Sequence, residues 1–150
     1  MATSRDDRGW SEEGQRGFEA GAPLEAYEAI YRLVLMSYRY RCAITGEQFL
    51  PDVGLIHPHL EVVAIRPRAL GGPLEISNFL ALEEHAAKAF RAGIIEIEDD
   101  YSVVVARPQA LDRAVAVRLH PGGRLLVPDE ALFQPSPAHL AFARRANRGG

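Results

Sequence analysis

The chain has 150 residues, of which 47% are hydrophobic, and this is enough for one domain with a real core but not for two. A formal net charge of −3 and a pI near 5.9 exclude a uniformly basic nucleic-acid-binding coat. The single cysteine, Cys42, excludes an internal disulfide and a cysteine-rich zinc cluster, and it indicates a reducing, cytoplasmic location.

Residues 1–22 are rich in charge and glycine, and they contain no apolar run long enough for a signal peptide or a membrane span. This composition predicts a flexible N-terminal arm. The arm either has no function or binds a partner protein, in which case Trp10 and Phe18 are the anchors. Residues 23–147 are expected to form a single domain.

A helix is predicted for residues 23–36, because Pro23 suits a first helical turn and apolar residues recur at helical spacing. The apolar positions are Leu24, Tyr27, Ile30, Tyr31, Val34 and Leu35. Tyr31, Tyr38 and Tyr40 alternate with arginines, which is also compatible with a base-stacking set, but aromatic residues on such a stripe favour the core. Cys42 follows in the run Arg-Cys-Ala-Ile-Thr-Gly and is predicted to be structural.

The segment at residues 60–93 begins with a short apolar strand at 60–65, followed by a turn rich in proline and glycine. A helix is predicted directly after this turn. Ser77 or Asn78 is expected to cap the helix, and Leu82, Ala86 and Phe90 recur at a four-residue interval along one face. The predicted order is therefore strand, loop and helix.

These residues resemble the core of the HNH (His-Me finger) endonucleases. The resemblance is to a bacterial branch whose core reads Leu-Glu-Ala-Ala-His-Ile-x-Pro, then Gly-Gly, Ile-Ser-Asn-Gly-Leu, and a helix ending His-x-x-Phe-Asp-x-Gly. The run from Leu60 to Pro67, the Gly71-Gly72 pair and Asn78 follow that order. Residues 37–46 and 125–145 are also similar to this branch, so the resemblance spans about residues 24–147.

The resemblance places Ala64 at the first histidine of the motif, Ala87 at the last histidine and Arg91 at the aspartate after it. In active relatives the first histidine takes a proton from the attacking water, and the last one helps to hold a divalent metal. An alanine methyl group has no lone pair for either task. The resemblance therefore implies no catalytic residue and no metal cofactor here, while the retained Asn78 is expected to tie the loop after Ala64 by hydrogen bonds.

A rebuilt metal site would have to use neighbouring side chains. Glu83 and Glu84 are predicted to share a helix face with Ala87, and His85 is the fallback nitrogen ligand, although a solvated acidic face is the commoner meaning of two glutamates. His57 and His59 precede the strand and are predicted to be surface or turn residues, with a part in a metal site as the alternative.

The remaining chain predicts β-structure and a final helix. Residues 94–105 contain two β-rich runs around an acidic turn, which favours a hairpin with Asp99 and Asp100 as turn formers and not as metal ligands. A further strand is predicted at 114–119, a turn and short strand at 121–127, and a helix at 138–146. The predicted fold is an α+β domain: an HNH-type ββα-metal finger core, a bracing N-terminal helix, a following β-hairpin and a C-terminal helix.

Three functions are compatible with this sequence. The first is a degenerate nuclease that binds DNA weakly and non-specifically, or binds a protein partner, without cutting; Arg66, Arg68 and Arg91 would then contact phosphate. The second is an active endonuclease that uses Mg²⁺ or another divalent metal at a rebuilt site, or whose alanines were engineered. The third is a structural subunit of a larger assembly. No membrane association is expected.

Overall fold

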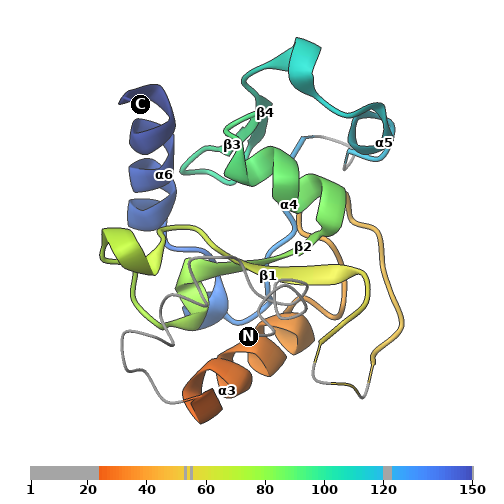
Figure 1. Cartoon of the computed structure of the whole chain (residues 1–150), viewed down its shortest axis with the longest axis vertical. Coiled ribbons are helices and arrows are strands. Elements are labelled where there is room, and N and C mark those ends of the chain that lie inside the picture. Colours follow the sequence, from red (N-terminus) through yellow and green to blue (C-terminus); the bar gives the residue numbers. More distant parts are fainter. Residues whose placement is uncertain (1–23, 53, 55, 120–122, 150) are drawn as a thin grey trace, which may run out of the picture.

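The computed structural model describes residues 24–149 except residues 53, 55 and 120–122 (Figure 1). The predicted arm, with Trp10 and Phe18, lies outside the described residues. The described part is a mixed α+β fold with small antiparallel sheets. Its helices and strands are α3 (Leu24–Ser37), β1 (Leu60–Ala64), β2 (Phe79–Glu83), α4 (Glu84–Arg91), β3 (Ile95–Ile97), β4 (Val103–Val105), α5 (Arg113–Ala116) and α6 (Pro137–Gly149).

The centre of the fold is the antiparallel pair of β1 and β2, in which Leu60 is opposite Glu83 and Ala64 is opposite Phe79. Helix α3 lies on one side of this pair and α4 on the other (Figure 1). Because both faces are covered, β2 is buried at every position and does not alternate between apolar and polar residues.

The predicted start of the helix after Asn78 is wrong, because strand β2 lies between Asn78 and the helix. The chain continues from Asn78 into an extended strand, and the helix begins only at Glu84. The four-residue spacing of Leu82, Ala86 and Phe90 runs across this strand–helix boundary, so it mimics one helical face. The order at this core is therefore strand, strand and helix.

The predicted hairpin is present as β3 and β4, and the predicted C-terminal helix is present as the longer α6. At the hairpin tip, the backbone N–H of Ser102 donates to Asp100 Oδ1 at 3.0 Å, and Arg144 of α6 donates to Asp99 Oδ1 at 2.8 Å. Both aspartates therefore act in the turn and its packing. A further bond of 2.8 Å, from Arg144 Nη1 to the Ile97 carbonyl, ties α6 to β3.

The prediction of a strand at residues 114–119 is wrong. This valine-containing stretch begins with helix α5, because Asp112 caps it by accepting a hydrogen bond of 2.8 Å from the Ala114 N–H. The short strand predicted around 125–127 is reduced to an isolated bridge between Ser102 and Arg124, and the Leu126 N–H donates to the Ala43 carbonyl.

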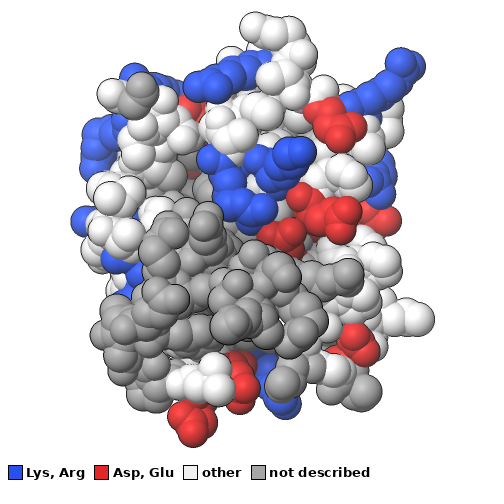
Figure 2. Space-filling model, viewed as in Figure 1, with Lys and Arg blue, Asp and Glu red and all other residues white. Residues whose placement is uncertain are grey.

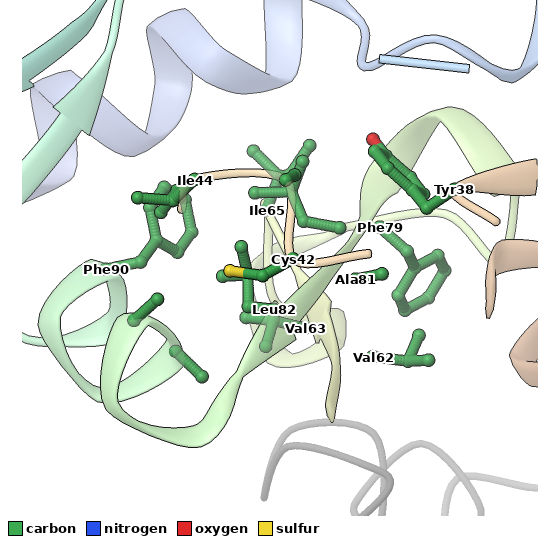
Figure 3. Close-up of a cluster of buried hydrophobic side chains, with 14 of the residues drawn as sticks. Tyr38, Cys42, Ile44, Val62, Val63, Ile65, Phe79, Ala81, Leu82 and Phe90 are labelled. Atoms are coloured by element: carbon green, nitrogen blue, oxygen red, sulfur yellow. The ribbon is translucent and has the colours of Figure 1, made fainter. Parts of the chain in front are cut away.

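The core forms where α3 and the segment after it meet the central strands. Tyr31 and Tyr38 are buried and Tyr40 is half-buried, so these aromatic residues pack inside the domain as predicted. Cys42 is fully buried, and it lies among Val63, Ile65 and Leu82 (Figure 3). The N–H of its neighbour Ala43 donates to the Ala81 carbonyl of β2 at 2.8 Å. Cys42 is therefore structural.

Within the described residues, no helix has the length and apolar character needed to cross a membrane.

Candidate functional site

The loop after β1 is held by one side chain, Asn78. Its Oδ1 accepts a hydrogen bond of 2.9 Å from the Arg66 N–H, and its Nδ2 donates to the carbonyls of Arg66 at 2.9 Å and Pro73 at 3.1 Å. Asn78 is fully buried, so its amide replaces the water that this backbone would otherwise bind. The resemblance to the HNH core implies hydrogen bonds from Asn78 to this loop, and these are the bonds expected.

The paired glycines let the same loop close on itself. A Cβ at Gly72 would lie 1.7 Å from the Arg66 carbonyl oxygen, so no side chain fits there. Gly71 has a φ of +88°, a left-handed conformation that glycine adopts without strain. Together, the two residues place the Arg66 backbone next to the Asn78 amide and fix the path of the chain beyond Ala64.

Ala64 is at the end of β1, beside a cavity of about 110 Å³. Arg91 of α4 lines the same cavity, and α6 closes it with mainly apolar side chains. The lining residues from α6 are Phe142, Ala143, Ala146 and Asn147. The strand end, the end of α4 and the C-terminal helix therefore converge here, although α6 is distant in sequence.

Ala87 lies in α4, one helical turn before Arg91. Its relative exposure is 0%, compared with 8% for Ala64, and it does not line the cavity. Both methyl groups are thus part of the core cluster. Neither presents a proton acceptor or a metal ligand.

The three candidate arginines have different surroundings. The Arg66 guanidinium stacks over the Phe142 ring at 4.3 Å, and its Nε donates to the Leu70 carbonyl at 2.9 Å. Arg91 forms an ion pair of 2.8 Å with Glu61. Arg68 is half-buried and donates to the Gly72 carbonyl at 3.3 Å. Arg91 therefore lines the cavity and Arg66 stacks on Phe142, another of its lining residues, whereas Arg68 is hydrogen-bonded to the loop itself.

Of the fallback metal ligands, Glu83 lies at the end of β2 and caps α4, which corrects its predicted place on a helix face with Ala87. One carboxylate oxygen of Glu83 accepts from the Ala86 N–H at 3.3 Å, and the other pairs with His85 Nδ1 at 2.6 Å. This carboxylate raises the pKa of His85 above its usual value of 6.5. Glu84 is exposed. In the described residues, no three His, Cys, Asp or Glu side chains are placed so that they could hold a metal.

The two histidines before β1 organise the turn. His57 is buried, which corrects the surface alternative for this residue: its Nδ1 accepts from the N–H groups of His59 and Leu60, and its Nε2 lies 2.9 Å from the Leu50 carbonyl. His59 stacks on Phe49, with ring centroids 5.3 Å apart. His57 is thus a turn residue.

Sequence reasoning missed two contributors to this region. The first is Glu61. Burial raises the pKa of its carboxyl group, and the neighbouring Arg91 opposes this effect. Phe142 was missed because only tertiary packing brings α6 beside Arg66. The available signal was a charged residue within an otherwise apolar strand; the Glu61 side chain is only 14% exposed and is paired with Arg91.

Positive charge is spread over the face that carries α4, and red acidic atoms lie beside it (Figure 2). The basic residues of α4 are Lys88 and Arg91, and its acidic neighbours include Glu84 and Glu61. The face is therefore mixed in charge, not a continuous basic surface.

No protein-family model matches the chain, and no curated protein matches it significantly. Among solved structures, the chain is similar to a protein described as a modification dependent TagI restriction endonuclease, with 26% sequence identity and a TM-score of 0.55. The similarity covers 77% of this chain but only 36% of that chain. The fold is thus nuclease-like, and this chain spans the smaller part of the longer protein.

Proposed function

We propose that this chain is a nuclease-like domain of the HNH type that binds the DNA backbone weakly and does not hydrolyse it. The observation that carries the proposal is the pair of buried methyl groups at Ala64 and Ala87, where the resemblance requires a general base and a metal ligand. The similarity to a restriction endonuclease supports the nuclease-like part.

Hydrolysis of a phosphodiester needs a group that takes a proton from water and a charge that stabilises the phosphate oxygens in the transition state. Neither alanine supplies such a group. The carboxylate of Glu83, at the end of β2, uses one oxygen to cap α4 and the other to pair with His85. The residues around Ala64 therefore support binding without cleavage, and no divalent cofactor is required for binding.

Phosphate binding is assigned to Arg66 and Arg91. A guanidinium donates two parallel N–H bonds to a phosphate. Arg91 lines the cavity next to Ala64, and Arg66 stacks on Phe142, which lines the same cavity. Glu61 competes for Arg91, so the affinity is low. Contacts to phosphate alone carry no sequence information, and we expect little preference between DNA sequences.

The test is a plasmid-nicking assay with Mg²⁺, Mn²⁺, Ni²⁺ or Zn²⁺, in parallel with binding to a labelled duplex. We expect retention of the duplex at low salt and no nicking by any metal. Nicking that scales with protein and metal would instead establish an active enzyme with a rebuilt site. A lack of binding at low salt would favour a domain that acts only through protein partners.

A variant carrying Ala64→His and Ala87→His tests whether these two positions alone account for the missing activity. Because Ala87 is fully buried, its replacement is expected to cost stability, and circular dichroism must first show that the variant is folded. Ala64→His alone is the matched control, since its site borders a cavity. Nicking by the double variant only would support the assigned positions.

A further inference from the structure

The outer face of α3 carries apolar side chains that are largely exposed. Leu33 is 41% exposed and Met36 is 58% exposed, although the opposite face of the helix is buried against the core. Beside them is a groove of about 290 Å³. The apolar residues that line it are Leu33, Met36, Pro128 and Phe133.

The order of large and small residues on this face is symmetric about the level of Tyr31 along the helix, although the Tyr31 side chain itself is buried on the opposite face. Ala29 precedes Tyr31 by two residues and Leu33 follows it by two; Ala26 precedes it by five and Met36 follows it by five. If a second α3 lies antiparallel across this face, each large side chain meets a small one of the partner. Such size matching permits close helix packing.

The charges on the flank of the helix have opposite signs in its two halves. Glu25 and Glu28 are in the first half of α3, whereas Arg32 and Arg39 are in its last part and just beyond its end. Antiparallel association places Glu28 of one copy beside Arg32 of the other, whereas Arg39 is already paired with Asp129 of its own copy. A parallel arrangement would bring like charges together.

We propose that two copies of this chain form a homodimer with a twofold axis near Tyr31, through antiparallel packing of the outer faces of α3. A twofold interface uses the same surface patch on both copies, so the patch must complement itself in shape and charge, as this one does. A 14-residue helix is only about 21 Å long. The interface is therefore small, and the dimer dissociates on dilution.

The first test is sedimentation velocity of the full chain from micromolar to sub-millimolar concentrations. We expect a monomer–dimer equilibrium that Met36→Glu shifts to monomer, because a carboxylate would be desolvated in the interface. Leu50→Glu is the control, since Leu50 is 86% exposed and does not line the groove. A monomer at every concentration, or equal effects of the two variants, would overturn the proposal.

The second test exchanges the charges at the interface. A nonspecific association would not depend on which charges are paired. Glu28→Arg and Arg32→Glu are each expected to weaken self-association at least tenfold. Mixed in equal amounts, the two variants should form a heterodimer, since every cross-interface pair is then of opposite charge. Circular dichroism controls for the helix itself. Failure of the mixture to associate would contradict the antiparallel arrangement while leaving the DNA-binding proposal untouched.

Discussion

At the scale of single residues, Asn78 has the largest role that a single side chain plays around the candidate site. It satisfies one donor and two acceptors of the backbone from a position that is fully buried. A hydrocarbon side chain in its place would leave these three backbone groups without partners. The loop after Ala64 would then have to open to reach water.

We therefore predict that Asn78→Ala lowers the free energy of unfolding by about 2–4 kcal/mol, the cost of leaving several buried polar groups unpaired. Urea denaturation measures this loss as a shift in the midpoint. Ser77→Ala, at the half-buried neighbour, is the control and should change stability by less than about 0.5 kcal/mol. A similar small loss in both variants would show that the amide is not needed.

At the scale of elements, the start of α4 contains a pH-dependent contact. His85 gains a partner in Glu83 on folding, so its pKa in the folded protein lies above the unfolded value near 6.5. The protonated form is thereby favoured in the folded state. The contribution to stability is complete below the unfolded pKa and is lost as pH rises through the folded pKa.

We predict that the free energy of unfolding falls as pH rises from the unfolded pKa near 6.5 through the higher folded pKa, by no more than about 1 kcal/mol because the histidine is partly exposed. Comparison with His85→Gln isolates this contribution. Proton NMR of the imidazole should give a pKa above 6.5, and Glu83→Gln should return it toward that value. An unchanged imidazole pKa in Glu83→Gln would contradict the assigned cause.

The attachment of α6 to β3 is a second property of the elements. Arg144 is 14% exposed at its side chain and reaches both the Ile97 carbonyl and Asp99, whereas its neighbour Arg145 is exposed. We predict that Arg144→Ala costs about 1–3 kcal/mol of stability and that Arg145→Ala costs less than about 0.5 kcal/mol. Thermal unfolding of the two variants, which have equal charge, compares them directly. Equal melting temperatures would count against this attachment.

The helices and strands differ in how well the sequence predicts them. Helices α3 and α6 and the hairpin of β3 and β4 have clear periodicity or turn signals, and they could be predicted. Strand β2 could not, because a strand buried on both faces lacks alternation and joins α4 without a break. In α5, the cap from Asp112 outweighs the β-preference of the valines that follow.

For the whole molecule, the site was only partly predictable. The place of Asn78 and the methyl groups at Ala64 and Ala87 follow from short motifs that are local in sequence. The surroundings of the arginines depend on distant elements, since Phe142 comes from α6 and Glu61 from the edge of β1. Local patterns do not encode which distant surface will cover a side chain.

The DNA binding that we propose belongs to the scale of the whole molecule, and its salt dependence is the measurement that tests it. The logarithm of the affinity should fall with the logarithm of salt concentration by about 0.9 for each phosphate contact. Replacement of Arg66 and Arg91 by alanine should flatten this slope by about one each, and replacement of Arg68 by less. Arg113→Ala is the control, because α5 lies across the molecule from α6 (Figure 1). Equal slopes in all variants would contradict the assignment of Arg66 and Arg91 to phosphate binding.

The burial of Cys42 gives the protein an internal reporter of its own opening. Since this is the only thiol of the chain and no part of it is exposed, a thiol reagent can react only with molecules whose core has opened. The labelling rate, relative to that of the unfolded chain, then measures the free energy of that opening. Because Ala43 is hydrogen-bonded to β2, we expect this value to approach that of global unfolding. Fast labelling in the absence of denaturant would reveal a separate, local opening beside the central strands.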